Sequence, residues 1–132
     1  QGGSKDHAMS APVPASHVQI KRAYEPPAPE DGTRILIDRL WPRGVKKEAL
    51  SLDHWSKELA PSTALRQWFG HDPALWIEFQ RRYAAELQSQ AEPMEALRAL
   101  ARKGRLTLVY GAHDEVHNNA VVVRALLLAH EK

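Results

Sequence analysis

The chain of 132 residues contains no cysteine. This absence excludes a disulfide framework, a thiolate nucleophile, and zinc or iron–sulfur centres that depend on cysteine ligands. The sequence also lacks any apolar run near the roughly 20 residues that a transmembrane helix needs, and it shows no signal-peptide hydrophobic segment. We therefore expect a cytoplasmic protein that has no membrane partner.

The sequence also lacks a strong excess of charge of one sign. It contains 18 lysine and arginine residues against 16 aspartate and glutamate residues, for a formal net charge of +2. A DNA-binding protein normally shows a denser basic stripe. The glycine-rich phosphate-binding loop, the GxGxxG dinucleotide motif and the GxSxG nucleophile motif are missing as well. These absences argue against an ordinary ATPase, dehydrogenase or α/β-hydrolase.

The length and composition fit one domain. Residues 1–16 are predicted to be a tag remnant, QGGSKDHA, followed by a mobile arm rich in proline, alanine and serine. Residues 17–132 are predicted to form a single α/β domain. A domain of this size buries roughly two-thirds of the surface of its unfolded chain, so it needs no disulfide or metal to fold.

Hydrophobic patterns predict the secondary structure. Residues 17–22 alternate with the period of a half-buried or edge strand, whereas the apolar runs at 35–37 and 106–110 indicate strands covered on both faces. Helices are expected around 47–59, after the caps Ser62 and Asp72, from Pro93 to Gly104, and in the apolar segment before the C-terminus. This order predicts a small, mainly parallel sheet of about three strands, covered by about four to five helices.

Two polar loops are predicted to meet at one edge of the sheet. If the strands at 34–38 and 106–110 are parallel neighbours, both end at the edge where open α/β sheets bind ligands. The first strand leads into DRLWPRG at 38–44, and the second leads into GAHDEVHNN at 111–119. The sequence therefore predicts a crevice between these loops.

The first loop concentrates groups that bind anions. Arg39 and Arg43 lie four residues apart around a proline, and guanidinium groups match the paired oxygens of carboxylates and phosphates. Asp38 would orient them, and Trp41 could stack on a ligand ring. The structural alternative is that Asp38 pairs with an arginine, Trp41 packs in the core and the rest is a turn. For Trp41 the core is favoured; for the loop as a whole the sequence leaves both interpretations open.

The second loop offers a helix start and a histidine. Asp114 can cap the last helix by accepting from the backbone of Val116 or His117, which would place His117, Asn118 and Asn119 in the first helical turn. His117 beside carboxylates could act as a general acid or base. The alternative is an exposed turn that is polar for that reason alone. His113 and His117 have the spacing of metal ligands on one helix face, but His113 precedes the cap, so we predict no metal site.

Four segments resemble one protein family. They are Tyr24 with the proline-rich loop after it, RILIDRLWPRG at 34–44, LAPSTALRQWF at 59–69, and LVYGAHDEVHNNAVV at 108–122. Together they resemble the YeaO-like group within the bacterial family named domain of unknown function 488, over residues 18–128. The resemblance implies a small cytoplasmic bacterial α/β protein, and it assigns no reaction, substrate or catalytic residue.

The resemblance also bears on the choice between metal and anion chemistry. It implies a lysine at the position of His113 and variation at that of His117, whereas the arginine cluster and Asn118 fit the family pattern. This favours anion binding over metal binding.

The leading hypothesis is a site for a small anionic ligand, such as a nucleotide, a phosphorylated metabolite or a carboxylate, with no cofactor and no assigned reaction. The alternative is a module that binds nucleic acid or protein without catalysis, based on the tryptophans and on Lys21, Arg22, Arg43, Lys46 and Lys47. His117 is the predicted acid or base. The predicted ligand-binding residues are Asp38, Arg39, Trp41, Arg43, Asp114, Asn118 and Asn119.

Overall fold

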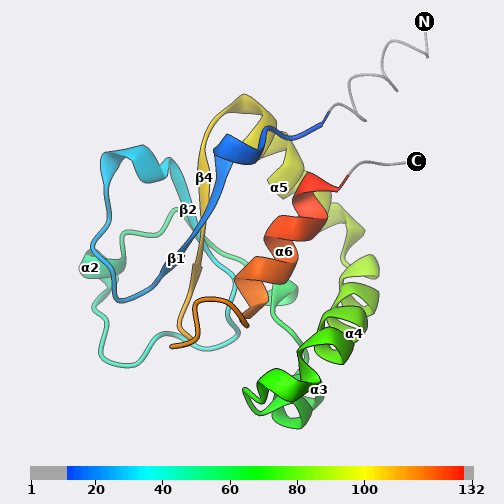
Figure 1. The fold of residues 1–132 in the computed structure, drawn as a ribbon. Helices are drawn as coiled ribbons and strands as arrows, with labels where there is room; N and C mark the ends of the chain where they lie inside the picture. Colours follow the sequence, from blue (N-terminus) through cyan, green and yellow to red (C-terminus); the bar gives the residue numbers. More distant parts are fainter. Residues whose placement is uncertain (1–11, 130–132) are drawn as a thin grey trace, which may run out of the picture.

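The computed structural model describes residues 12–129 and contains a four-stranded parallel sheet with the order β1-β4-β2-β3 (Figure 1). The α/β class and the parallel sheet are confirmed, and β1 lies at a sheet edge as its alternating pattern predicts. One strand more is present than expected. The strands are β1 (Val18–Arg22), β2 (Thr33–Leu36), β3 (His54–Trp55) and β4 (Leu106–Tyr110).

Helices cover both faces of the sheet. Helices α4, α5 and α6 lie on one side and α2 lies on the other, with α3 next to α4 near the lower end of the view (Figure 1). Short 3₁₀ turns at 15–17, 29–31, 57–59 and 73–75 connect these elements. The helices are α2 (Lys47–Leu50), α3 (Thr63–Phe69), α4 (Trp76–Gln88), α5 (Ala91–Lys103) and α6 (Asn119–Leu128).

Each central strand contributes to two hydrophobic cores. In β2 and the residue that follows it, Ile35 and Ile37 belong to the larger core under α4, α5 and α6, whereas Leu36 belongs to a smaller core beside α2. In β4, Leu108 and Val109 divide in the same way. Successive side chains of a strand point to opposite faces, so a continuous apolar run is expected where both faces are covered.

Two predicted helix starts are confirmed by their caps. The hydroxyl oxygen of Ser62 accepts a hydrogen bond from the backbone N–H of Leu65 at 3.1 Å, and α3 follows directly. A carboxylate oxygen of Asp72 accepts from the backbone N–H of Ala74 at 3.0 Å. The chain after Asp72 forms one 3₁₀ turn before α4 begins at Trp76.

The predicted helix at 47–59 is wrong. Helix α2 ends at Leu50, and Ser51 adopts a left-handed backbone with φ of 50°. The chain then pairs with β2: the backbone N–H of Asp53 donates to Arg34 O at 2.8 Å, and that of Ser56 donates to Leu36 O at 2.8 Å. Pairing with an open sheet edge outweighs the weak helical pattern of this segment.

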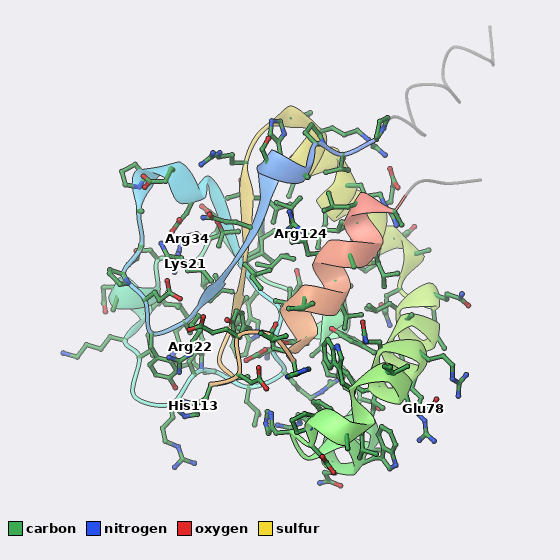
Figure 2. All side chains as sticks on the ribbon, in the orientation of Figure 1. Lys21, Arg22, Arg34, Glu78, His113 and Arg124 are labelled. Carbon is green, nitrogen blue, oxygen red and sulfur yellow. The ribbon has the colours of Figure 1, made fainter. Side chains whose placement is uncertain are left out.

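A buried ion network joins β1, β2 and the turn before β2 (Figure 2). Asp31 is 1 % exposed and Arg34 is 4 % exposed. The carboxylate of Asp31 lies 2.7 Å from the Arg34 guanidinium and 3.1 Å from the Lys21 ammonium group. Burying these charges is tolerated because each is paired and hydrogen-bonded.

The N-terminal arm predicted at 1–16 falls mostly outside the described residues. Of the remainder, Val13 is buried against the larger core, and the Arg124 guanidinium donates to the carbonyl of Ala15 at 3.1 Å. Within residues 12–129, no helix combines the length and hydrophobicity needed to cross a membrane.

Candidate functional site

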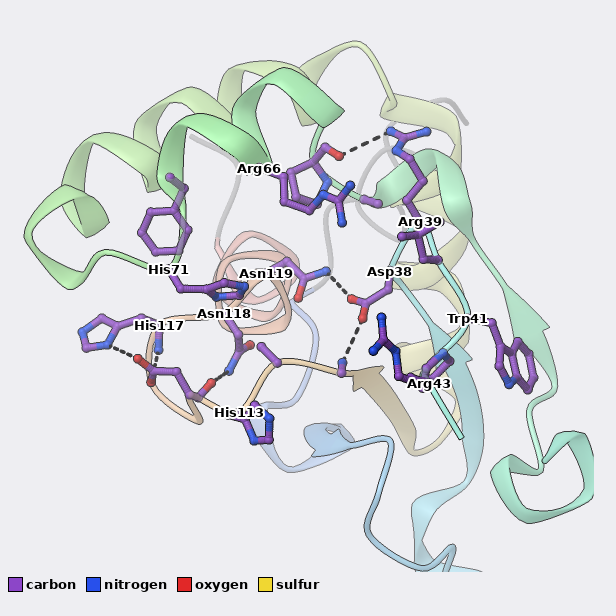
Figure 3. A pocket seen from close by; sticks show the side chains of 18 of the residues that line it. Asp38, Arg39, Trp41, Arg43, Arg66, His71, His113, His117, Asn118 and Asn119 are labelled. Atoms are coloured by element: carbon purple, nitrogen blue, oxygen red, sulfur yellow. Dashed lines mark hydrogen bonds and ion pairs between the residues drawn. The ribbon is translucent and has the colours of Figure 1, made fainter. Parts of the chain in front are cut away.

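The two polar loops meet at the carboxyl ends of β2 and β4, as predicted. Asp38 connects them (Figure 3). One carboxylate oxygen accepts from the backbone N–H of Gly111 at 2.9 Å, and the other accepts from the side-chain amide of Asn119 at 2.9 Å. Leu36 and Val109 are register partners in neighbouring parallel strands, so the residues after them emerge side by side.

A cavity of about 580 Å³ opens between the loops. This volume lies within the range of roughly 300–1,000 Å³ that small-molecule sites occupy. Helix α3 and the turn after it complete the wall. The acidic and basic side chains lining the cavity are three arginines (Arg39, Arg43 and Arg66), three histidines (His71, His113 and His117) and two aspartates (Asp38 and Asp114).

Asp38 does not have the partners that the sequence suggested. No ion pair within residues 12–129 joins it to an arginine, so the pairing expected in the structural alternative is wrong, and its role as orienter of Arg39 and Arg43 stays a prediction. The end of β4 places the N–H of Gly111 within its reach instead. Burial raises the pKa of the Asp38 carboxyl above its ordinary value, and the hydrogen bonds from Asn119 and Gly111 partly oppose this effect.

Arg39 and Arg43 both line the cavity. The Arg39 guanidinium makes one long hydrogen bond, 3.4 Å, to the carbonyl of Pro61. Arg43 is held through its backbone, because its carbonyl accepts from the Tyr24 hydroxyl at 3.0 Å. Neither guanidinium forms an ion pair with another residue of the 12–129 segment.

Sequence reasoning missed Arg66 and His71. Both line the cavity, and the positive charge of Arg66 acts on the Asp38 carboxylate. Their side chains point toward the space in front of Asp38 and Asn119 (Figure 3). Arg66 was hidden among the exposed residues of a short helix, and His71 resembled part of a helix start. The sequence feature that could have indicated His71 is its position directly after Gly70, the residue at which α3 ends.

The backbone at His71 is unusual. Its φ of 58° is left-handed, and Gly70 before it has φ of 54°. A left-handed non-glycine residue is uncommon, and its strain persists where the surroundings hold it in place. Here the ring of His71 lies beside that of Phe69, with centroids 6.1 Å apart, at the cavity wall.

Trp41 packs into the smaller core, in agreement with the structural alternative. Its indole N–H donates to the carbonyl of Val45 at 2.6 Å, and its ring meets Trp55 edge to face with centroids 5.4 Å apart. The Trp41 ring lies on the far side of the loop from Asn119 (Figure 3). Trp41 is nevertheless among the residues that line the cavity, and its stacking on a ligand stays a prediction.

The last helix begins later than predicted. Asp114 accepts from the backbone N–H groups of Val116 at 2.8 Å and His117 at 2.9 Å, as expected, but these bonds close a turn. Helix α6 starts at Asn119, and the cap is Asn118, whose side-chain oxygen accepts from the backbone N–H of Val121 at 3.0 Å. The predicted helical turn at 115–118 is therefore corrected to a loop, and Asn118 is buried.

His117 and Asp114 form a side-chain pair. The Nδ1 atom of His117 lies 2.9 Å from a carboxylate oxygen of Asp114, and the ring meets Trp76 edge to face with centroids 5.1 Å apart. Hydrogen bonds from the backbone of His117 and Val116, with the His117 ring, lower the pKa of Asp114 to about 2. The ring points away from Asp38 (Figure 3). An acid or base role for His117 stays a prediction.

His113 and His117 do not lie on one face of a helix, because both residues precede α6. His113 lies against the Arg22 guanidinium, with 3.4 Å between the nitrogen atoms. Among residues 12–129 no group of three or more histidine, aspartate or glutamate side chains is arranged to hold a metal ion.

A family model described as the inactive DUF488-N3 subclade matches residues 17–132. The chain belongs to this domain-of-unknown-function family. The uncharacterized protein YeaO of Escherichia coli is 44 % identical over 107 residues, which cover 81 % of this chain and 93 % of that protein. The uncharacterized protein Rv3073c of Mycobacterium tuberculosis is 37 % identical over 115 residues, covering 87 % and 97 %. No solved structure matches the chain significantly.

Proposed function

We propose that this DUF488 protein binds a small anionic ligand in the cavity between the 38–44 loop and the 111–118 loop. The observation that carries the proposal is the set of three arginines facing one cavity. None of the three forms an ion pair with a residue of the described segment. Guanidinium groups in this state retain their hydrogen-bond donors for the oxygens of a phosphate or carboxylate.

The electrostatics of the cavity favour an anion. Three arginines outnumber the two aspartates that line it, and Asp114 already interacts with His117. Charges of one sign around a concave surface raise the local concentration of the opposite ion and speed its binding.

The roles of the predicted residues follow from their contacts. Arg43 and Arg66 would hold the anion, with His71 beside them and Arg39 at the Pro61 side. Asn119 positions Asp38, which closes the inner end of the cavity. Asn118 and Asp114 would act indirectly, by fixing the loop and the start of α6.

Binding without catalysis is the simpler form of the proposal. The matching family model is described as inactive. The cavity wall, as far as residues 12–129 form it, contains no serine, threonine or lysine that could serve as a nucleophile. His117 is the one acid or base that the sequence suggested, and its ring faces away from Asp38 (Figure 3).

The nucleic-acid alternative is less well supported by the contacts. Of the five basic residues on which it rested, Lys21 is paired with Asp31 at 3.1 Å. Arg22 donates to the carbonyl of Ala112 at 2.9 Å and lies over the ring of Tyr24. These cations contribute to the fold and do not form one basic stripe with exposed tryptophans.

The test combines thermal shift and calorimetry at low ionic strength, with inorganic phosphate, pyrophosphate and citrate as probes. At a ligand concentration of 100 Kd the fold should gain about 2.7 kcal/mol. The variant Arg43→Met/Arg66→Met should lose this gain. The matched control Lys46→Met/Lys47→Met removes two charges from exposed residues outside the cavity and should keep it. Failure of every anion, including nucleotides, to stabilise the wild type would overturn the proposal.

A further inference from the structure

We propose that the anion is the phosphate of a nucleoside monophosphate, whose ribose hydroxyls donate to Asp38 and whose base covers Tyr24 and Leu40. This inference rests on the proposed function, because the phosphate would occupy the site of Arg43, Arg66 and His71. It adds two contacts that a bare anion cannot make. The cavity of about 580 Å³ is also far larger than an inorganic phosphate requires.

The first added contact concerns Asp38. A carboxylate among arginines at the inner end of the cavity repels a simple anion and weakens its binding. An ionised carboxylate has about four acceptor positions, and two are used by Gly111 and Asn119. The remaining positions suit a ligand that carries O–H donors close to its anionic group. Adjacent ribose hydroxyls have this chemistry.

The second added contact concerns exposed apolar side chains. Residues 12–129 contain four large hydrophobic side chains with high exposure, and two of them, Leu40 at 60 % and Tyr24 at 48 %, line this cavity. Tyr24 is fixed by its hydrogen bond to the backbone of Arg43. A flat apolar ring at this position would remove both side chains from water, which a phosphate or citrate ion does not do.

The three contacts come from different parts of the cavity wall. Tyr24 and Leu40 are tied to the 38–44 loop, Asp38 lies at the end of β2, and Arg66 and His71 come from α3 and the turn after it. A nucleoside monophosphate carries a base, a sugar with hydroxyls and a phosphate in one molecule, so it offers a partner to each of these parts. Arg43 extends toward the space in front of Asp38 (Figure 3).

The experiment uses the full chain and compares affinities by calorimetry. Adenosine 5′-monophosphate should bind at least tenfold more tightly than inorganic phosphate. Loss of a hydrogen bond to a charged group should make 2′,3′-dideoxyadenosine 5′-monophosphate at least about tenfold weaker than the parent nucleotide. This ligand pair tests Asp38 on the wild-type fold. The variant Asp38→Asn should show the same loss, but it can also disturb the bonds to Gly111 and Asn119.

Side-chain variants test the base contact. Leu40→Ser should weaken the nucleotide severalfold and leave phosphate affinity unchanged. The matched control is Ile77→Ser, which alters a side chain that is 80 % exposed on α4 and does not line the cavity. It should change neither affinity. Equal effects of both variants, or a loss of phosphate affinity in Leu40→Ser, would overturn the assignment of the base.

The outcomes separate the two proposals. If phosphate, pyrophosphate or citrate binds as tightly as the nucleotides, the nucleotide inference fails and the anion site stands. If no anion or nucleotide binds, both fail. The 5′-phosphorylated end of RNA has the same chemistry, so a 5′-phosphorylated tetranucleotide is included. Tighter binding of this tetranucleotide than of the monophosphate would overturn the assignment to a free nucleotide.

Discussion

Asn118 joins the loop beside the cavity to the start of α6. Its side chain is 3 % exposed. The side-chain oxygen accepts from the backbone N–H of Val121 at 3.0 Å, and the side-chain nitrogen donates to the carbonyl of Asp114 at 2.9 Å. Replacing Asn118 with alanine removes both bonds at once. We predict that this single change lowers the free energy of unfolding more than any exposed substitution in the same loop.

The magnitude follows from these contacts. Loss of an N-cap side chain costs about 1 kcal/mol. A carbonyl or N–H left without a partner costs about 1–3 kcal/mol more when it is buried; Asp114, whose carbonyl loses its donor, is half-buried, so the lower end of this range applies. We therefore expect Asn118→Ala to lower the unfolding free energy by about 2–3 kcal/mol. In a chain of this length the melting temperature should fall by roughly 8–12 °C.

Urea denaturation followed by circular dichroism measures the effect. Asn118→Ser keeps a cap oxygen and loses the donor, so it should recover about half of the loss. Gln88→Ala, at an exposed residue at the end of α4, is the matched control and should stay within about 0.5 kcal/mol of wild type. An Asn118→Ala variant as stable as this control would refute the reasoning, because it would mean that Asn118 does not hold the start of α6.

Three further predictions concern the backbone, acid stability and nucleic acid. Gly32→Ala should unfold the protein or destabilise it by several kcal/mol, because φ is +66° and a Cβ would lie 2.2 Å from the carbonyl oxygen of Arg105. The control in thermal melts is Gly104→Ala, whose Cβ would meet nothing within 4 Å. Asp114 has its pKa lowered to about 2, so its stabilising contribution is complete above its ordinary pKa near 3.8 and is lost as the pH falls toward 2. The stability difference between wild type and Asp114→Asn should therefore shrink over this range in acid titrations. Nonspecific DNA and RNA should not bind at low salt; tight binding that weakens steeply with added salt would revive the nucleic-acid alternative.

The central strands could be predicted because their local pattern matches their surroundings. The apolar runs at 35–37 and 106–110 are covered on both faces, so every residue in them is apolar or buried. Strand β3 could not be predicted in this way. It consists of His54 and Trp55, and its place is set by pairing with β2 about 19 residues earlier in the chain. No local pattern specifies so short a strand.

The start of α6 shows why side-chain chemistry alone was insufficient. Asp114 and Asn118 are both good cap residues, and both accept hydrogen bonds from backbone N–H groups farther along the chain. The sequence favours Asp114 because it comes first. The fold selects Asn118, because Ala120 and Val123 must face the larger core and this sets where the helix can begin.

The position of the cavity was predicted correctly from the order of the strands. The hydrogen-bond partners of Asp38 within it were not. Asp38 stands next to Arg39 in the sequence, which suggested an ion pair. Its actual partners, Gly111 and Asn119, are 73 and 81 residues away. Proximity in sequence is a poor guide where neighbouring parallel strands bring distant loops together. Arg66 reached the same cavity from α3, a helix whose exposed face carries no pattern that predicts a site.

The residues at the inner end of the cavity and the arginines on its outer wall contribute differently to the stability of the folded protein. Ligand binding is therefore expected to change that stability. The inner end is built by Asp38 with Gly111 and Asn119, so it forms whenever β2, β4 and α6 are assembled. The cations Arg43 and Arg66 lie on exposed parts of the wall, where charges of one sign repel in the empty protein. If the anion proposal holds, these arginines add little to the stability of the free fold, because their mutual repulsion opposes the attraction of Arg66 to Asp38, and they raise the stability of the complex. Replacing them with methionine should therefore leave the empty protein equally stable or more stable while it abolishes stabilisation by the ligand, a combination that two arginines serving to hold a turn would not produce.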